Sequence, residues 1–83
     1  MFKIKLTAKA RRELKILSVL DKLRVGEIIE DIKDDPLIGK PLSRELTRRY
    51  AYRVGVYRII YKVNQEDKIV DIISAGHRST AYN

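Results

Sequence analysis

The 83-residue sequence contains no cysteine and only one histidine. Without cysteine the chain can form no disulfide framework, no thiolate nucleophile and no zinc finger. One histidine among scattered carboxylates has no metal-ligand spacing, so we expect no metal and no other cofactor. No apolar run approaches the roughly 20 residues that a membrane-spanning helix needs. These absences predict a small cytoplasmic protein that acts through its own side chains.

The length predicts a single domain spanning residues 1–83. A domain of this size buries only about 60% of the surface of its unfolded chain, so we expect a thin core. Residues 2–6 alternate apolar side chains with lysine. This alternation is typical of a strand and differs from the continuous apolar block of a signal peptide.

Positive charge is concentrated in the second part of the chain. The formal net charge is +7, and residues 40–83 hold nine Lys and Arg against four Asp and Glu, whereas residues 1–39 hold nine against seven. A basic surface on a small domain indicates binding to nucleic acid or to an acidic protein. A well-solvated charged surface without a partner is the alternative at this point.

Two helices are predicted between the first strand and Pro36. Thr7 is placed to cap the first helix, whose apolar stripe is Ala10, Leu14 and Leu17. We expect a break at residues 18–21 and a second helix that continues to about Lys33. Its apolar positions are Val25, Ile28, Ile29 and Ile32. The helix should stop at Asp34-Asp35-Pro36, because a residue before proline is forced out of the α region.

The remainder of the chain predicts strands. Residues 52–61 are rich in Val, Ile and Tyr, and Gly55 in their middle predicts a hairpin turn. A short strand is also possible within a basic loop, at residues 42–46. The last strand, residues 68–75, carries apolar side chains on both faces and belongs inside a sheet. The predicted fold is α+β, with two N-terminal helices packed on one face of a curved, mostly antiparallel four-stranded sheet.

Candidate functional residues lie in the hairpin and after the last strand. Arg53 and Arg58 interrupt the apolar run of the hairpin, and His77, Arg78 and Tyr82 follow the last strand. If that strand lies beside the hairpin, these five side chains could converge over the open face of the sheet. Arginine binds phosphate oxygens, histidine transfers protons near neutral pH, and tyrosine can act as a base or stack on a nucleobase. Such a set suits a phosphodiester.

Each of these residues also has a purely structural interpretation. His77 could simply pack or cap, and the two hairpin arginines could pair with Glu45 or Asp71. The tyrosines at 52, 57 and 61 are expected to be sheet or core residues. The basic residues of the loop form either a binding patch or a solvated segment; they are Lys40, Arg44, Arg48 and Arg49.

Taken together, the motifs resemble the RelE/ParE superfamily, the toxins of bacterial and archaeal toxin–antitoxin pairs. The resemblance covers essentially the whole chain. It rests on the helical Leu14 and Leu17, on Asp35-Pro36, on the hairpin sequence from Tyr52 to Tyr61, and on Gly76-His77-Arg78 with Tyr82. The fold of this superfamily agrees with the one predicted above.

For RelE-like members the resemblance implies a metal-independent ribonuclease that cuts messenger RNA in the ribosomal A site. It also implies a cognate antitoxin that neutralises the toxin in a hetero-oligomer. The implied catalytic residues are Arg53, Arg58, His77, Arg78 and Tyr82. Gly55 stands where a second basic residue of the first hairpin strand is expected. The implied assignment is therefore Tyr82 as base and His77 or Arg78 as acid.

The resemblance also assigns the basic loop. It implies that RNA or the ribosome is bound by Lys40, Arg44, Arg48 and Arg49. Two alternatives stay open for the family as a whole. ParE-like members share the fold but poison DNA gyrase by binding it, and an inactive member would be retained only for complex formation.

Overall fold

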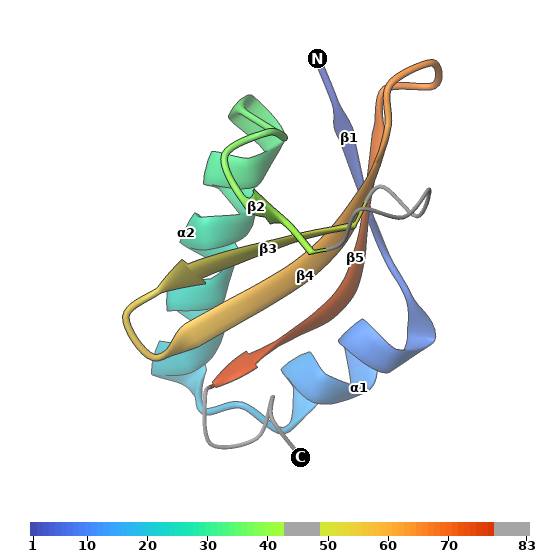
Figure 1. The fold of residues 1–83 in the computed structure, drawn as a ribbon. Helices are drawn as coiled ribbons and strands as arrows, with labels where there is room; N and C mark the ends of the chain where they lie inside the picture. Colours follow the sequence, from blue (N-terminus) through green and yellow to red (C-terminus); the bar gives the residue numbers. More distant parts are fainter. Residues whose placement is uncertain (43–48, 78–83) are drawn as a thin grey trace.

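The computed structural model describes residues 1–42 and 49–77. The elements, in chain order, are β1 (Lys3–Leu6), α1 (Ala8–Lys15), α2 (Val19–Asp34), β2 (Lys40–Pro41), β3 (Arg49–Val54), β4 (Tyr57–Asn64) and β5 (Ile69–His77). The strands form one sheet in the order β1-β5-β4-β3-β2 (Figure 1). Strand β1 pairs parallel with β5, and the other pairs are antiparallel. None of the helices in the described ranges is long and apolar enough to span a membrane.

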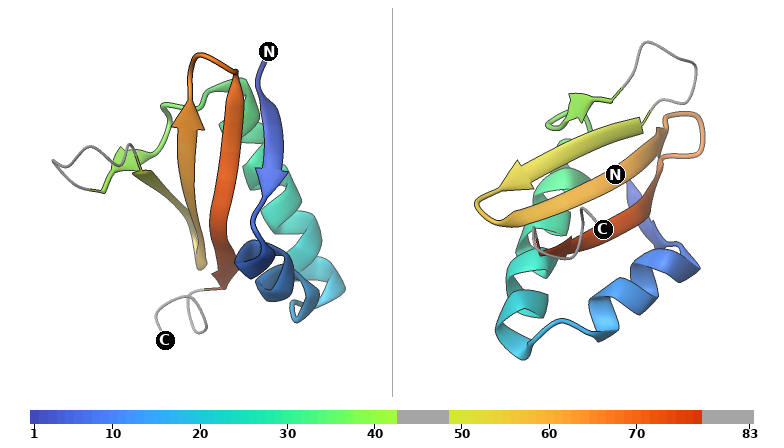
Figure 2. Two further views of the ribbon diagram at one scale, coloured as in Figure 1. Left: turned by 90° about the vertical axis from the view of Figure 1, so that its right-hand side faces the viewer. Right: turned by 60° about the horizontal axis from the view of Figure 1, so that its bottom comes forward.

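The α+β fold class is confirmed, with one correction to the sheet. The two helices lie on one face of a strongly twisted sheet and leave the other face open (Figure 2). The predicted four strands are present, and β2 adds a fifth. The additional short strand that the structure describes is β2 at Lys40–Pro41, just before the predicted range of 42–46. Residues 43–48 lie outside the described part. Strand β5 lies inside the sheet, as predicted, and it continues to His77, beyond the predicted end at residue 75.

Side-chain caps set the helix boundaries. The hydroxyl of Thr7 accepts a hydrogen bond from the Ala10 amide at 3.1 Å, as expected for the cap of α1, and donates to the Ile73 carbonyl at 3.1 Å. Ser18 caps α2 by accepting from the Asp21 amide at 3.1 Å. A cap satisfies a backbone donor that the helix itself leaves unpaired. The break between the helices therefore falls at residues 16–18, slightly before the predicted 18–21, because Ser18 caps α2 and Asp21 already belongs to its first turn.

The core lies between the helices and the sheet. Residues of β4 and β5 with alternating spacing point toward the helices, as strand geometry requires. They meet the buried stripe of α2 and Ala10 of α1. The fully or almost fully buried apolar residues are Ala10, Val25, Ile28, Ile32, Ile59, Tyr61, Val63, Val70, Ile72 and Ala75. Beyond the end of β1, the Glu13 carboxylate of α1 accepts from the Ser74 hydroxyl at 2.9 Å and the Ala75 amide at 3.1 Å. Glu13 thus covers the edge of β5 that β1 no longer pairs.

The fully buried Tyr61 connects the sheet to the chain that leaves α2. Its hydroxyl donates to the Pro36 carbonyl at 2.7 Å and accepts from the Gly39 amide at 3.0 Å. A Cβ at Gly39 would lie 2.7 Å from this hydroxyl, so only glycine fits. The Tyr61 ring stacks on Tyr50 with centroids 5.5 Å apart. These contacts hold residues 36–39 against the hairpin and so place β2.

We expect Tyr61→Phe to lower the free energy of unfolding by about 1–3 kcal/mol, because a buried carbonyl and a buried amide lose their hydrogen-bond partner. Urea unfolding measures the change. The matched control is Tyr52→Phe, since the Tyr52 hydroxyl makes no hydrogen bond in the residues that the structure describes. An equal, small effect of both substitutions would show that the Tyr61 hydroxyl contributes nothing.

A second expectation concerns alkaline pH. Burial is the main cause that raises the pKa of Tyr61 above its ordinary value. In the unfolded chain this tyrosine ionises near pH 10, while in the folded protein it stays protonated to higher pH. Its contribution to stability is therefore complete below about pH 10 and is lost as the pH rises through the folded pKa. Unfolding at several alkaline pH values should show a steeper loss for the native protein than for Tyr61→Phe.

Candidate functional site

The centre of the open face is a row of residues across three strands. Arg53 of β3 lies directly opposite Arg58 of β4, which in turn lies opposite Gly76 of β5. Side chains at paired positions point to the same face of a sheet. The next pair along β4 and β5 is Tyr57 with His77, and both of these side chains face the helices. Because side chains alternate along a strand, Arg53 and Arg58 face the opposite, open side. Gly76 adds no side chain, and the two guanidinium groups dominate this row.

Two arginines at directly opposed positions form an unusual pair. Like charges facing each other across two strands destabilise a sheet, and their Cβ atoms are typically about 4.5–5.5 Å apart. Arg53 is exposed, and Arg58 is half-buried with its Nε shielded from solvent. Each arginine has further interactions in the structure. An anion shared by both guanidinium groups would relieve their repulsion, and a phosphate matches their planar donors.

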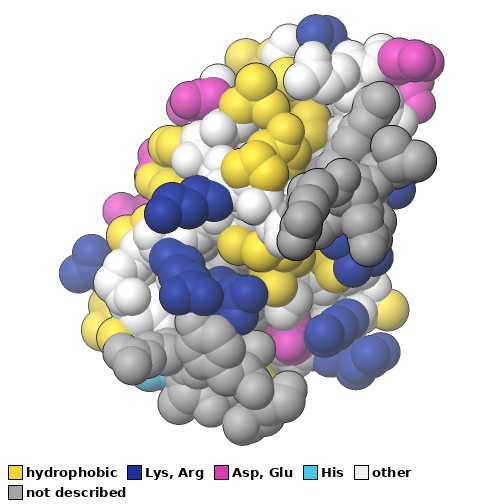
Figure 3. All heavy atoms as spheres, viewed as in Figure 1, with side chains coloured by type: hydrophobic (Ala, Val, Ile, Leu, Met, Phe, Trp, Pro, Cys, Tyr) yellow, Lys and Arg dark blue, Asp and Glu magenta, His cyan; other side chains and the backbone are white. Residues whose placement is uncertain are grey.

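The open face carries additional positive charge. Lys40 of β2 lies opposite Ala51, two residues before Arg53 on β3, and Arg49 at the start of β3 lies opposite Lys62. Figure 3 views this face and shows Lys and Arg side chains gathered over the hairpin of β3 and β4. Asp71, one of the expected partners of the arginines, is instead paired in register with Lys5 and Lys62. The sheet therefore presents a basic face to an incoming ligand.

His77 does not share this face. It pairs with Tyr57, and the two rings meet edge to face with centroids 5.8 Å apart. The Tyr57 hydroxyl donates to Asp21 Oδ1 of α2 at 2.6 Å, which places the pair on the helix side of the sheet. The expected convergence of His77 with Arg53 and Arg58 over the open face is therefore wrong. The reason is strand alternation, since His77 is one residue beyond Gly76 and points the opposite way.

The hydrogen bond to Asp21 is the main cause that raises the pKa of Tyr57 above its ordinary value, with desolvation second. The phenol thus remains a protonated donor, which suits a structural contact. It ties the first turn of α2 to the end of the hairpin and, through its ring, to the end of β5. The sequence also allowed a structural role in which His77 packs, and the observed contact of His77 with Tyr57 agrees with that role.

Several predicted site residues lie outside the described ranges. They are Arg44, Arg48, Arg78 and Tyr82, together with the proposed ion-pair partner Glu45. Lys40, Arg49, Arg53, Arg58 and His77 are described. Nowhere in residues 1–42 and 49–77 do three His, Cys, Asp or Glu side chains form a group that could hold a metal ion.

Two acidic residues around the site were not predicted from the sequence. Asp21 follows Ser18 by three residues, a spacing related to the capping box, and this could have marked the helix start but not its bond to Tyr57. Glu13 has no local signal at all, because its partners are more than sixty positions away along the chain. Both residues support the end of β5 from the helix layer.

Comparison with known proteins shows the family to which this chain belongs. A family model described as the ParE toxin of the type II toxin–antitoxin system parDE matches residues 4–82. Toxin RelG of Mycobacterium tuberculosis is 33% identical over 87 residues, covering 98% of this chain and 95% of RelG.

Solved structures agree. A chain of the toxin–antitoxin complex RelBE2 from Mycobacterium tuberculosis is 35% identical, with a TM-score of 0.83 over 93% of this chain and 98% of that one. The isolated Escherichia coli RelE toxin shares the fold at 22% identity, with a TM-score of 0.78 over 99% of this chain and 92% of that one. Family match, sequence identity and fold lead to one conclusion: the chain belongs to the RelE/ParE superfamily of toxins of type II toxin–antitoxin systems.

Proposed function

We propose that this toxin is a metal-independent endoribonuclease that cuts messenger RNA on the ribosome and so inhibits translation in the cytoplasm. The observation that carries the proposal is the opposed pair Arg53 and Arg58 on a basic, open sheet face. A ribonuclease needs permanent positive charge next to a phosphate, and arginine supplies it without a metal. The pairing of β3 with β4 fixes the backbone positions of both arginines, so both side chains can reach one phosphate from the same face.

In the proposed reaction the 2′-hydroxyl of the RNA attacks the adjacent phosphorus and the 5′-oxygen of the next nucleotide leaves. The product ends are a 2′,3′-cyclic phosphate and a 5′-hydroxyl. Negative charge grows on the non-bridging oxygens, which Arg53 and Arg58 would stabilise. One proton must leave the 2′-hydroxyl and one must reach the departing oxygen.

We assign the proton transfers to the chain end. Tyr82 is proposed as the base, with neighbouring arginines lowering its pKa. Arg78 is preferred to His77 at the leaving group, because the His77 ring packs against Tyr57 on the helix side. His77 then acts by fixing the strand end from which Arg78 follows. Lys40, Arg44, Arg48 and Arg49 are proposed to bind RNA or ribosome phosphates.

A second function has one observation in its favour. The matching family model is that of a ParE toxin, and ParE-like toxins are the members expected to poison DNA gyrase. In that case the basic face would bind protein and no RNA would be cut. Induction of the gene separates the two functions, because a ribonuclease accelerates messenger RNA decay whereas a gyrase poison triggers DNA damage signalling.

We also propose a cognate antitoxin as partner. The similar RelBE2 structure is a toxin–antitoxin complex, as is the Escherichia coli RelBE structure, which is 20% identical. On this chain, large apolar side chains are exposed on the side of α2 that faces away from the core. They are Ile16 just before the helix, Val19, Leu20 and Leu23, each more than 60% exposed. Contiguous exposed apolar residues mark a protein interface, and the positive charge of the chain favours an acidic partner.

Arg58→Ala should reduce RNA cleavage on the ribosome by roughly 10²–10³-fold, the loss expected when one fixed donor to the transition state is removed. Arg58→Lys should recover only part of the rate, because lysine keeps the charge and loses the planar pair of donors. The control is Lys9→Ala on α1, in the helix layer, with circular dichroism as the check on folding. Equal cleavage by Arg58→Ala and the control would remove Arg58 from the mechanism.

Leu20→Glu combined with Leu23→Glu should weaken antitoxin binding by at least about tenfold. Both side chains are exposed, so the stability of the toxin should change by no more than about 0.5 kcal/mol. Leu37→Glu, an exposed apolar residue beyond the other end of α2, is the matched control. Calorimetric titration at two salt concentrations measures the affinities. Undiminished binding by the double variant would place the interface elsewhere.

A further inference from the structure

A depression lies where the short strand β2 separates from β3. Its volume is about 590 Å³, and its walls are residues 38–42 on one side and residues 51–53 on the other. This volume falls in the range of roughly 300–1,000 Å³ that is usual for small-ligand pockets. It lies next to the Arg53–Arg58 pair, at the outer edge of the sheet.

Small residues create the depression, and the core fixes its shape. Strand β2 pairs with β3 at Lys40–Ala51 and Pro41–Tyr50, and the Leu42 amide donates to the Arg49 carbonyl at 2.9 Å, so residues 52–53 lie beyond the paired positions. Gly39 approaches the hairpin so closely that a Cβ there would lie 3.0 Å from the Ala51 carbonyl oxygen. Because Gly39 is also bonded to the buried Tyr61 hydroxyl, this wall is anchored in the core. The depression is therefore present before any ligand arrives.

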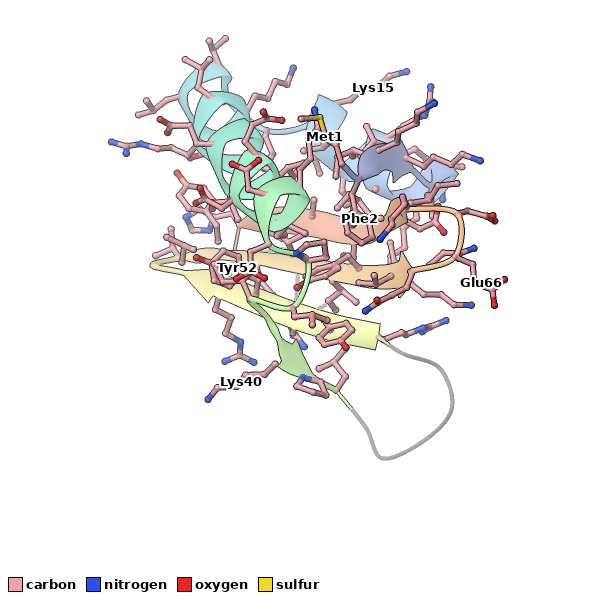
Figure 4. The ribbon with its side chains drawn as sticks, turned by 90° about the horizontal axis from the view of Figure 1, so that it is seen from above. Met1, Phe2, Lys15, Lys40, Tyr52 and Glu66 are labelled. Carbon is pink, nitrogen blue, oxygen red and sulfur yellow. The ribbon has the colours of Figure 1, made fainter. Side chains whose placement is uncertain are left out.

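The walls combine apolar surface with positive charge. Ile38 and Leu42 are 39% and 43% exposed and, with Pro41 and the Ala51 methyl group, offer an apolar bed. Lys40 and Arg53 stand at the rim. In Figure 4 the Lys40 side chain points away from the helix layer, whereas Tyr52 lies between the sheet and α2. A nucleobase packs on apolar surface through its flat face, and its phosphate is attracted to cations.

The strand register links this depression to the site. Lys40 is opposite Ala51, so Arg53 is its diagonal neighbour, and Arg53 is opposite Arg58. Diagonal neighbours in a sheet are about 7–8 Å apart. Positive charge thus continues from the Arg53–Arg58 pair to Lys40 in steps comparable with those between successive phosphates of an extended single strand.

We propose that the depression between residues 38–42 and residues 51–53 is a nucleotide subsite. It takes the nucleotide of single-stranded RNA adjacent to the phosphate held by Arg53 and Arg58. The base lies against Ile38, Leu42 and Ala51, and Lys40 binds its phosphate. This inference rests on the proposed ribonuclease function, and it adds a fixed place for the base next to the cleaved bond.

The test is a nuclear magnetic resonance titration of the full chain with a short RNA that carries 2′-deoxy substitutions and cannot be cut. The methyl signals of Ile38, Leu42 and Ala51 should shift on binding. Ala51→Leu fills the depression and should weaken binding about tenfold, while Ala8→Leu on the exposed start of α1 should not. Lys40→Met should reduce the salt dependence of log K by about 0.7, the value for one phosphate of a single strand, while Lys9→Met on the exposed surface of α1 should not.

The outcomes separate the subsite from the function. Shifts at the three methyl groups, together with the loss in Ala51→Leu and Lys40→Met, support the subsite. RNA binding that moves signals at Arg53 and Arg58 but leaves the methyl groups and both variants unchanged overturns the subsite and keeps the ribonuclease. If the native chain binds no RNA, or if only an antitoxin peptide moves the methyl signals, the nucleotide subsite is overturned. Because Lys40 is exposed, its variant tests the subsite even if Ala51→Leu fails to fold.

Discussion

The hydroxyl of Tyr61 is the interaction on which the arrangement of the open face depends. It is buried in the centre of the sheet and holds both the Pro36 carbonyl and the Gly39 amide. These two hydrogen bonds fix the chain between α2 and β2, which has no helix or strand of its own to hold it. As a consequence, Lys40 pairs with Ala51 and stands beside the arginine row. A core tyrosine therefore determines where a surface lysine lies.

The sheet separates two kinds of residue by alternation. Arg53 and Arg58 occupy the open face of the sheet, whereas Tyr57 and His77 occupy the helix face and pack there. The open face is thus available for ligand binding, while the helix face stabilises the strands. From the helix layer, Asp21 bonds to Tyr57, whose ring packs on His77, and Glu13 bonds to the edge of β5. Both contacts therefore stabilise the end of β5, the strand that precedes Arg78. Rigid support of this kind is what preorganised charge requires.

Helix α2 has apolar side chains on two sides for two different reasons. Val25, Ile28 and Ile32 complete a thin core, which an 83-residue chain needs for stability. Leu20 and Leu23 contribute nothing to that core, because they point into solvent. A toxin that is held by a partner would bury them on complex formation. The same helix can thus serve folding on one side and association on the other.

Most helices and strands could be predicted from the sequence, because their causes are local. The cap at Thr7, the stop at Pro36, the apolar periods of the helices and the turn at Gly55 each depend on neighbours along the chain, and Gly55 has the positive φ of 61° that favours glycine. The hairpin that contains Arg53 and Arg58 was also predicted, whereas the register that pairs the two arginines came from the structure. Which side chains share a space could be learned only from the folded chain. Strand alternation and register placed His77 against Tyr57, Glu13 on β5 and Lys40 beside Arg53, and such pairings depend on long-range packing that no local pattern contains.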